Sequence, residues 1–440
     1  MRCPTLHELP AAPIAKIGWP WTEATNPLPE LTPAGHAWPK LTVVTPSFNQ
    51  GEFLEETIRS ILLQGYPNLE YIIIDGGSSD QSVEVIRRYE KWLTYWMSEK
   101  DSGQANAINK GFARSTGEIR AYLNSDDVYL PNAVSQAALL FSQQPETALL
   151  YGDCELIDEN SELTEEWFAP DFEIAELLFR CYIAQPATFW RASSQQVAGL
   201  FAEQLHYAFD YEMWLRLAQS HQLTHLPRFL ARHRKTEGTK TVGNPEAFAP
   251  EIEQALRGFF GSPDVPAAVR RLESDAYAFA SFNQALLSLS LNHVDESRAA
   301  LRSAFRHSPD VVKNQRERLI RALVDHADPS TDLQKSKAYL DRVFEVLPES
   351  AMSLLPLKST AVRRIEVLHA VRSKDEQSLA RARRNLAPLL LDDAAWLQDR
   401  TVRGDFVGIL FGDWAIGRLA GLKQSARTVR SAFGRGKRYA

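Results

Sequence analysis

The sequence predicts an α/β protein with a doubly wound, mixed and mostly parallel sheet, followed by an α-helical C-terminal domain. Two observations predict this fold. Between residues 41 and 144, continuous apolar runs typical of buried strands alternate with segments of helical period. From about residue 250 onward, the helical period continues with few strand signals.

The alternating segments can be assigned in order. Continuous apolar or β-branched runs predict strands at 41–46, 70–75, 92–99 and 118–125. Amphipathic spacing between the strands predicts helices at 51–64, 81–89, 103–115 and 131–144. The last of these helices has proline in its first turn, a favoured position for that residue. We expect this α/β domain to cover residues 41–245.

Residues 1–40 have a different character. They contain eight prolines, a density that interrupts any regular element. Trp19, Trp21 and Trp38 lie among these prolines. We therefore expect an irregular N-terminal extension that packs on the α/β domain through its tryptophans.

Bulk composition narrows the class of protein. The chain has 440 residues, 44% of them hydrophobic, which is enough for two or three domains with buried cores. Cys3, Cys154 and Cys181 form no CxxC pair, which argues against a zinc module or a disulfide scaffold. The sequence shows neither an apolar stretch of signal-peptide length at its start nor an uncharged apolar run of 18 residues. We expect a cytoplasmic protein.

Charge is distributed unevenly along the chain. Residues 1–250 carry 19 Lys and Arg against 32 Asp and Glu, whereas residues 251–440 carry 30 against 23. Such an acidic front half is a poor binder of nucleic acid, so we expect no nucleic-acid partner. The last 20 residues, 421–440, contain six basic and no acidic residues. This tail is either a plain frayed helix end or a peripheral attachment to the inner face of an anionic membrane.

Polar residues follow three of the predicted strands where each strand ends. In an open α/β sheet, ligands bind beyond the carboxyl ends of the strands. A turn or helix cap is the simpler explanation for such residues, and we prefer it for Ser79 and Asp80, because a helix follows at once. The candidates for ligand binding are Thr45, Pro46 and Asn49 at or just after the end of the first strand, Asp75 at the end of the second, and Asn124, Asp126 and Asp127 at or just after the end of the fourth.

The adjacent carboxylates of Asp126 and Asp127 repel each other at neutral pH, which a bound cation would relieve. A divalent metal held by one or two carboxylates and by phosphate oxygens fits Mn²⁺ or Mg²⁺. The chain has no GxxxxGK[ST] loop and no GxGxxG turn after the first strand, which argues against P-loop phosphotransfer and dinucleotide redox chemistry. A nucleoside diphosphate leaving group remains the natural ligand.

At these residues the chain resembles a family 2 glycosyltransferase of the GT-A fold, over about residues 40–240. Four segments in this order carry the resemblance: TPSFNQGEFLEETIRSILLQGYPNLEYIIIDGGSSD, SEKDSGQANAINKGFARSTGEIRAYLNSDDVYLP, QPATFWR and FDYEMWLRLA. The resemblance implies transfer of a sugar from a nucleotide sugar to an acceptor hydroxyl, with inversion at the anomeric carbon. The acceptor would be a carbohydrate or a lipid-linked molecule in surface polysaccharide or glycoconjugate synthesis, and family habit favours UDP.

The resemblance also assigns roles to the edge residues. Asp75 matches the carboxylate that reads the nucleobase, with Thr45 and Pro46 shaping the same pocket. The segment NSDD matches the DxD region of the family, in which Asp126 would approach the ribose or the metal and Asp127 would coordinate the metal. Asn49 and Asn124 belong to the same nucleotide-sugar site.

Asp210 is the candidate catalytic base. FDYEMW matches a family motif in which Asp210 takes the position of the base and Phe209 replaces the usual acidic neighbour. The helical spacing supports Asp210 independently of the resemblance. Asp210 lies on the same face of the predicted helix as the apolar Met213, Trp214 and Leu217, so its carboxylate should face inward. An inward-facing carboxylate is costly unless it lines a cleft. The competing explanation is a dipole partner in the first turn of a helix.

Two further segments concern the nucleotide. Many members carry arginine at the position of Ile108, which here reads as helix core. Either a polar residue nearby makes this contact instead (Asp101, Gln104, Asn106 or Lys110), or the contact is absent. Members also often have a His/Arg loop near the diphosphate, similar to ARHRKTEGTK at 231–240. His233 or Arg234 could neutralise phosphate charge there, although a solvated loop explains the segment equally well.

The helical domain is predicted over residues 250–440. Residues 276–310 read as a helical hairpin with some likeness to a TPR unit, although no 34-residue period continues beyond it.

Two alternatives to the glycosyltransferase stay open at this point. A sugar-1-phosphate nucleotidyltransferase has the same type of sheet and also requires a metal. That class, however, has Arg and Lys in the loop after the first strand, and the corresponding segment TPSFNQGEF contains neither. The other is a non-catalytic scaffold that binds a nucleotide sugar.

Overall fold

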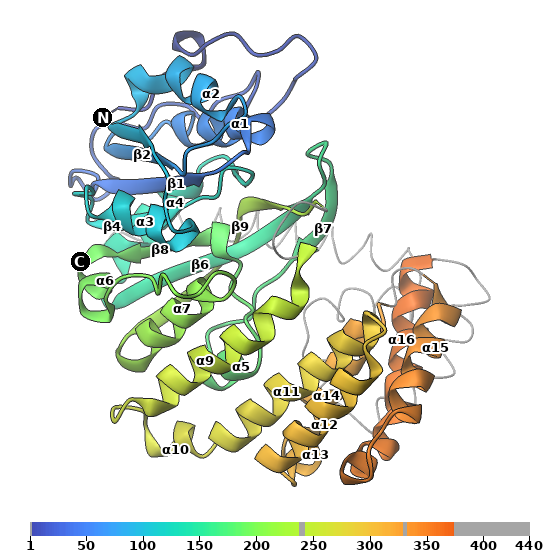
Figure 1. Ribbon diagram of the computed structural model, residues 1–440. Coiled ribbons are helices and arrows are strands. Elements are labelled where there is room, and N and C mark those ends of the chain that lie inside the picture. Colours follow the sequence, from blue (N-terminus) through green and yellow to red (C-terminus); the bar gives the residue numbers. More distant parts are fainter. Residues whose placement is uncertain (1, 237–242, 329–331, 374–440) are drawn as a thin grey trace, which may run out of the picture. The chain divides into compact units, whose positions relative to one another are not determined.

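The computed structural model describes residues 2–236, 243–328 and 332–373 (Figure 1). The chain divides into two compact units, with the boundary between Ala276 and Tyr277. The domain boundary expected at 245–250 falls just before helix α9 (Phe248–Gly261), which belongs to the first unit. There α9 contacts α7 (Phe209–Ser220), and the Gln219 amide donates a hydrogen bond of 3.1 Å to the Phe259 carbonyl.

One mixed sheet forms the centre of the first unit. Its described strands follow the order β3-β2-β1-β4-β8-β6-β9-β5, and β7 pairs with β6 at the side of this path. The strands are β1 (Leu41–Ser47), β2 (Leu69–Asp75), β3 (Tyr95–Ser98), β4 (Ile119–Tyr122), β5 (Val128–Tyr129), β6 (Thr147–Ile157), β7 (Leu163–Trp167), β8 (Thr188–Arg191) and β9 (Gln222–Arg234).

Parallel and antiparallel pairs occupy different parts of this sheet. The strands β3, β2, β1 and β4 are all parallel, and the register places Ser47 opposite Asp75 at their carboxyl ends. β8 runs antiparallel between β4 and β6, whereas β6 and β9 form a long parallel pair. β5 and β7 are antiparallel to their partners. The predicted α/β class and mixed sheet are confirmed.

Helices cover both faces of the parallel part (Figure 1). Val43 and Ile73 point to one face, where they share a core with Ile58 of α1 and Ile86 of α2. On the other face Gly111 of α3 lies against β1, so closely that an added Cβ would sit 2.5 Å from Cγ1 of Val44. The remaining helices of the first unit follow the later strands. In order, the first-unit helices other than α7 and α9 are α1 (Gly51–Leu62), α2 (Ser82–Tyr89), α3 (Gln104–Phe112), α4 (Ala133–Gln143), α5 (Ile174–Phe179), α6 (Ala192–Ala198) and α10 (Ala267–Arg270).

All eight elements predicted between residues 41 and 144 are present, with ends that differ by a few residues. The strand predicted at 92–99 is shorter because Glu90–Trp92 forms a 3-10 turn before it. The strand predicted at 118–125 ends at Tyr122, so the residues NSDD lie in the loop beyond it.

The N-terminal segment packs on this domain through its tryptophans, as the sequence predicts. It holds one short 3-10 turn at Leu6–Glu8. The Trp19 indole N–H donates a hydrogen bond of 2.7 Å to the Tyr129 carbonyl. The ring of Trp21 lies against the Arg59 guanidinium, and Trp38 meets Tyr66 edge to face at 5.4 Å.

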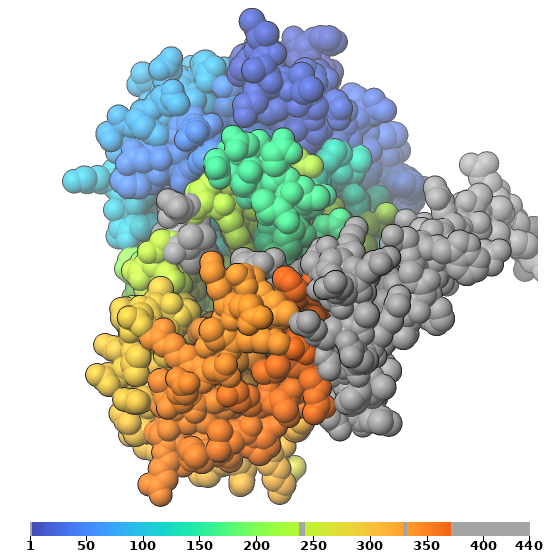
Figure 2. Space-filling view, turned by 90° about the vertical axis from the view of Figure 1, so that its right-hand side faces the viewer, coloured from blue at the N-terminus to red at the C-terminus, as the bar shows by residue number. Residues whose placement is uncertain are grey.

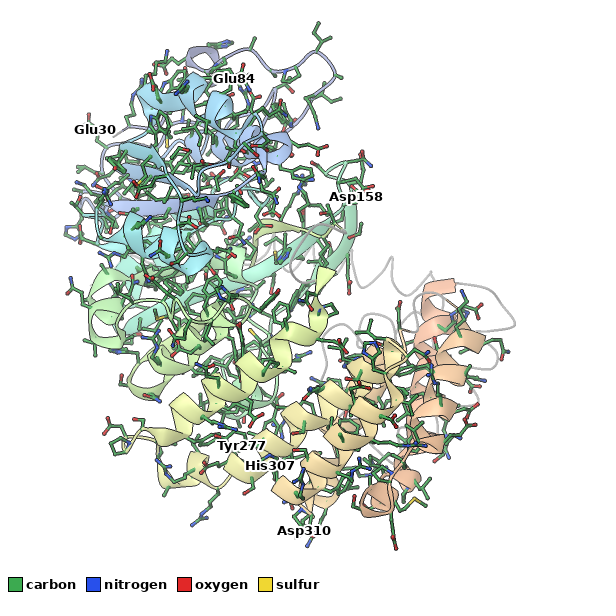
Figure 3. All side chains as sticks on the ribbon, viewed as in Figure 1. Glu30, Glu84, Asp158, Tyr277, His307 and Asp310 are labelled. Atoms are coloured by element: carbon green, nitrogen blue, oxygen red, sulfur yellow. The ribbon has the colours of Figure 1, made fainter. Side chains whose placement is uncertain are left out.

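The second unit is helical throughout its described part. The helices are α11 (Glu273–Ser290, which begins in the first unit), α12 (Val294–His307), α13 (Val311–Asn314), α14 (Arg316–His326), α15 (Leu333–Glu345) and α16 (Lys358–Ser373), with a 3-10 segment at Glu349–Leu357. The predicted hairpin is present as α11 and α12, joined by a turn in which Asn292 has a φ of +70°. Tyr277 and His307 close it by stacking at 5.4 Å (Figure 3). The likeness of this hairpin to a TPR unit stays a prediction.

None of the described helices has the length and apolarity needed to cross a bilayer. The basic tail at 421–440 lies outside the described residues.

Candidate functional site

The loops after β1 and β2 are joined to each other. Asn49 adopts a φ of +51°, and its amide oxygen accepts a hydrogen bond of 2.9 Å from the Ser79 N–H. In return the Asn49 N–H donates to the Ser78 hydroxyl at 2.8 Å. Asp80 is not the N-cap residue of either helix, but its carboxylate accepts from the first N–H of α1 (Gly51, 2.8 Å) and of α2 (Ser82, 2.9 Å).

Asp75 ends β2 as a fully buried carboxylate at the predicted edge of the sheet. It accepts hydrogen bonds from Gly77 N–H (3.1 Å), Ser78 N–H (2.9 Å), the Ser78 hydroxyl (2.5 Å) and the Ser98 hydroxyl (2.7 Å). These four donors hold the side chain in one orientation.

Thr45, Pro46 and Asp101 surround the same edge. Thr45 and Pro46 are buried in β1, and the Thr45 hydroxyl bonds the Tyr71 hydroxyl at 3.2 Å. Asp101 accepts from the Gly103 N–H at 2.9 Å. Its carboxylate lies so close to Gly76 that an added Cβ would sit 2.9 Å from an Asp101 oxygen. The glycine after Asp75 therefore lets the loop of Asp101 approach the end of β2.

Asn124 is the centre of a chain of amides. Its side-chain oxygen accepts from the Gln104 amide at 2.6 Å. Its amide group donates to Asp127 and to Gln185, both at 3.2 Å. Gln185 in turn donates to the Tyr122 carbonyl at 2.8 Å, which ties the chain to the end of β4. These contacts fix the Asn124 side chain within the protein.

The two adjacent carboxylates have different surroundings. Asp127 is 1% exposed, and its carboxylate accepts from Arg234 N–H at 2.9 Å as well as from Asn124. Its carbonyl accepts from the Thr57 hydroxyl at 2.7 Å. Burial raises the pKa of Asp127 to about 7, although the donors from Arg234 and Asn124 oppose the shift.

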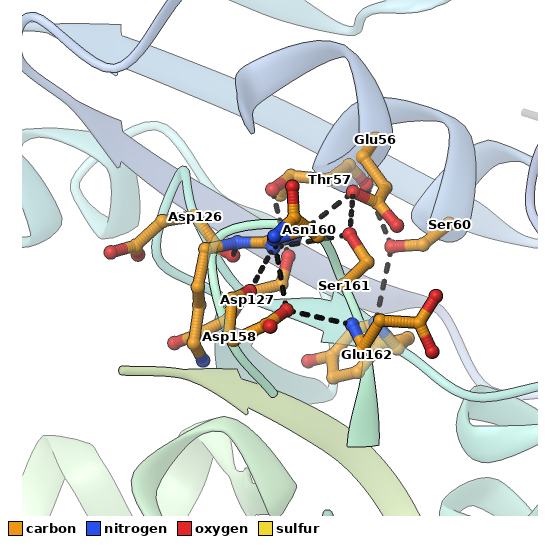
Figure 4. A network of polar contacts seen from close by, with 11 residues as sticks. Glu56, Thr57, Ser60, Asp126, Asp127, Asp158, Asn160, Ser161 and Glu162 are labelled. Atoms are coloured by element: carbon orange, nitrogen blue, oxygen red, sulfur yellow. Dashed lines mark hydrogen bonds and ion pairs between the residues drawn. The ribbon is translucent and has the colours of Figure 1, made fainter. Parts of the chain in front are cut away.

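Asp126 is only half-buried, and its carboxylate points away from the polar network around Asp127 (Figure 4). Among the described residues, no other side chain donates a hydrogen bond to it. Burial, followed by the neighbouring Asp127 charge, raises the pKa of Asp126 to about 7. His233 of β9 lies close enough to oppose that shift, and burial lowers the pKa of His233 to about 4.

Arg234 follows His233 in β9, and its buried side chain connects the NSDD loop to α1 and to the β6–β7 hairpin. Its side chain is 1% exposed and forms an ion pair of 2.9 Å with Glu56 of α1. The guanidinium also donates to the Asp126 carbonyl (2.9 Å), the Asp158 carbonyl (2.7 Å) and the Ser161 hydroxyl (3.1 Å). In Figure 2 the green residues of the β6–β7 hairpin border the blue N-terminal part, in agreement with the Ser161–Glu56 hydrogen bond of 2.8 Å. The buried guanidinium is thus committed to the protein's own groups.

Asp210 occupies the first turn of α7, and its carboxylate accepts from the Tyr211 N–H at 2.7 Å. It lies near enough to Tyr122 and Cys181 to raise the pKa of each, in addition to the larger effect of burial. The Asp127 carboxylate raises the pKa of the same Tyr122 hydroxyl. The predicted base and the NSDD loop therefore flank one buried phenol at the end of β4.

The structure thus brings the predicted residues together in two groups and one flanking position. Asn49, Asp75 and Asp101 meet at the ends of β1 and β2, and Asn124, Asp126, Asp127 and His233 meet at the loop after β4. Sequence reasoning missed Glu56 and Gln185, although both lie in segments that carry the family resemblance, because they act through contacts with residues distant in sequence. The roles predicted for all these residues stay predictions.

A divalent cation fits the donors around Asp126. Asp126 is the more exposed of the two carboxylates and has the imidazole of His233 close to it, whereas the Asp127 carboxylate turns inward to Arg234 N–H and Asn124. Such a set suits Mn²⁺ or Mg²⁺ when phosphate oxygens and water complete the coordination. Within the described ranges, no group of three or more His, Cys, Asp or Glu side chains is placed to hold a metal ion.

Comparisons with known proteins bear on the α/β part of the chain. Residues 42–172 match the family model described as glycosyl transferase family 2. The chain is thus similar to family 2 glycosyltransferases over this segment. The segment contains β1 to β7, hence both carboxylate sites at the sheet edge, while Asp210 and His233 lie beyond the matched residues.

Relatives of this α/β part share only part of their length with the chain. An uncharacterized glycosyltransferase of Rickettsia typhi is 27% identical over 192 residues, which cover 40% of this chain and 58% of that protein. The O-antigen biosynthesis protein RfbC of Myxococcus xanthus is 29% identical over 187 residues, 41% of this chain and 15% of that protein. The chain therefore spans little more than half the length of the Rickettsia relative.

Among solved structures, the mannosyltransferase PcManGT of Pyrobaculum calidifontis in complex with GDP-Man and Mn²⁺ aligns with a TM-score of 0.46. It has 15% sequence identity, and the alignment covers 79% of this chain and 90% of that one.

Proposed function

We propose that the protein transfers a sugar from a nucleoside-diphosphate sugar to an acceptor hydroxyl, with inversion at the anomeric carbon. The observation that carries the proposal is the half-buried carboxylate of Asp126 beside Asp127, at the sheet edge of a segment similar to family 2 glycosyltransferases. UDP is the favoured nucleotide by family habit. The name of the Myxococcus relative supports an acceptor in surface polysaccharide or glycoconjugate synthesis. A cytoplasmic site of action, with the tail 421–440 at the inner face of the membrane, belongs to the same proposal.

The first group of residues would hold the nucleoside. Asp75 would accept a hydrogen bond from the nucleobase, and Thr45 and Pro46 would form the wall beside it. Asn49 keeps the two loops at a fixed separation through its contacts with Ser78 and Ser79. Asp101 lies next to Gly76 and would approach the nucleotide from the β3 side.

Asp126 and His233 are the residues that would hold a divalent cation. The charge of that cation would stabilise the diphosphate as it leaves. The contacts of Asp127 favour a supporting role, because Arg234 N–H and Asn124 already engage its carboxylate. Coordination by Asp127 itself remains a prediction from the sequence.

Asp210 would act as general base on the acceptor side. The acceptor oxygen forms a bond to the anomeric carbon as the bond from that carbon to the diphosphate oxygen breaks. The hydroxyl proton passes to the Asp210 carboxylate at the same time. A positioned base contributes a factor of about 10²–10⁴ to such a step.

Isothermal titration of UDP and GDP with Mn²⁺, Mg²⁺ or EDTA tests the donor site. We expect tight binding of one nucleotide only with metal, and a loss of at least about tenfold in Asp126→Asn. Asp158→Asn is the matched control, because its exposed carboxylate only orders a turn. Equal affinity with metal and with EDTA would contradict the proposal.

Sugar transfer by an Asp210 variant tests whether Asp210 is the general base. Asp210→Asn keeps the shape of the side chain and removes its basicity. Donor affinity should stay within a few-fold, while transfer to an identified acceptor falls by at least about a hundredfold. Near-parental turnover would exclude Asp210 as the base.

A further inference from the structure

Helix α9 has an unusual relation to the loop before α7. The Glu251 carboxylate, in the first turn of α9, accepts hydrogen bonds from three consecutive backbone N–H groups. They are His206 N–H at 2.8 Å, Tyr207 N–H at 2.7 Å and Ala208 N–H at 2.8 Å. The loop they belong to leads directly into α7, where Asp210 lies two residues after Ala208.

The start of α7 has no capping side chain of its own that could order the loop before it. The first N–H groups of a helix have no partner within it, and Ser, Thr, Asp or Asn at the N-cap usually supplies one. Here the N-cap is Ala208, which has no side-chain oxygen, and no side-chain cap forms there. Glu251, from another helix, instead binds the N–H group of Ala208 and those of the two residues before it, and its negative charge suits the positive end of the α7 dipole.

One aromatic contact and one hydrogen bond of Tyr207 also hold the loop at 206–208, the first of them against α9. The ring of Tyr207 meets Phe248 edge to face at 5.2 Å. The Asn244 amide donates to the Tyr207 hydroxyl at 3.2 Å. The apolar side of α9 is buried within the first unit through Leu256 and Phe259. The loop is therefore held by a helix that the sequence assigned to a different domain.

We propose that Glu251 is a positioning residue for the transfer reaction, which fixes the N-terminus of α7 and hence the direction of the Asp210 carboxylate. The proposal rests on the proposed function for the role of Asp210. Displacement of a catalytic group by about 1 Å can cost on the order of a hundredfold in rate. Asp75 and Asp126, which are proposed to hold the donor, belong to other loops, although His206 also lies against Gly103 beside Asp101.

Three variants test this positioning role. Glu251→Ala removes all three acceptor contacts, whereas Glu251→Gln keeps one oxygen that can accept some of them. Glu253→Ala is the matched control, because Glu253 lies on the same helix and pairs with Arg257 at the surface. We expect kcat to fall about tenfold to a hundredfold in Glu251→Ala and less in Glu251→Gln, with donor KM within about threefold of the parent. Glu253→Ala should be unchanged.

Hydrogen exchange supplies a readout that does not depend on the reaction. In Glu251→Ala the amides of residues 206–208 should exchange at least about tenfold faster, while the amides of β1 and β2 keep their protection. Glu251→Gln serves the same measurement if the alanine variant folds poorly. Unchanged exchange at 206–208 would overturn the contact, and unchanged kcat with faster exchange would overturn the positioning role. Full turnover in Asp210→Asn would instead contradict the proposed function of Asp210 as general base. The exchange rates at residues 206–208 would still test whether Glu251 holds this loop.

Discussion

Replacement of Arg234 by methionine tests whether the buried network behind the NSDD loop determines the stability of the first unit. The parent side chain is 1% exposed and contacts four acceptors from α1, the NSDD loop and the β6–β7 hairpin (Figure 4). Methionine has a similar length and packs well against Phe53, over whose ring the guanidinium lies at 4.5 Å. The change therefore removes charge and hydrogen bonds more than it removes volume.

The magnitude follows from what the change leaves behind. Glu56 is only 6% exposed and would keep a single described donor, the Ser161 hydroxyl at 2.8 Å. Removal of one partner from a buried ion pair costs about 3–5 kcal/mol, because the remaining charge is uncompensated. The Asp126 and Asp158 carbonyls also lose a donor. We expect Arg234→Met to lower the free energy of unfolding of the first unit by about 3–5 kcal/mol.

Chemical denaturation of the full-length chain, followed by tryptophan fluorescence, measures this loss. Arg232→Met is a matched control on the same strand, because Arg232 pairs with Glu155 at 2.8 Å but is 27% exposed. That pair should contribute less than about 1 kcal/mol. Adding Glu56→Gln to Arg234→Met should recover about 1–3 kcal/mol, since no uncompensated charge remains. Equal losses in the two single arginine variants would refute the reasoning.

Three other outcomes are expected. Asp80→Ala removes the acceptor for Gly51 N–H and Ser82 N–H, and equilibrium urea unfolding should show a loss of about 1–2 kcal/mol. Gly111→Ala would place a Cβ 2.5 Å from a Val44 methyl, so differential scanning calorimetry should show a loss of about 1–3 kcal/mol, whereas Gly258→Ala, with open space around it, should not destabilise. In the helical unit, burial lowers the pKa of His326 from 6.5 to about 4. Protonation therefore favours the unfolded chain, so the free energy of unfolding is highest above pH 6.5 and decreases as the pH falls towards 4. Unfolding at pH 7 and pH 5 should differ by about 2 kcal/mol more in the parent than in His326→Gln, from about 1.4 kcal/mol per pKa unit below 6.5.

The sequence predicted the elements of the parallel half well because each of them is locally determined. The strand that ends at Asp75 is a continuous apolar run, and the helix that begins at Gly51 has an amphipathic face, so pattern and structure agree. Contacts between distant segments carry no such signal. The pairing of Glu56 with Arg234 joins residues 178 positions apart, and α9 packs in the first unit although its period matches the helices that follow.

The pair at Asp126 and Asp127 shows most clearly where sequence reasoning stops. The two carboxylates are neighbours in a tight turn, closed by a hydrogen bond of 3.2 Å from the Asp127 N–H to the Asn124 carbonyl, and their side chains have different surroundings. Asp127 turns inward to Arg234 N–H and Asn124, while Asp126 remains half-buried on the outer side, near His233. Which of the two carboxylates turns inward depends on the positions of β9 and of the Asn124 amide, and the motif predicts neither position. The inner carboxylate orders the loop, and that order keeps the outer carboxylate in a position where its charge is poorly offset. A ligand that brings positive charge would relieve this imbalance, so the proposed metal site depends on a residue that need not touch the metal.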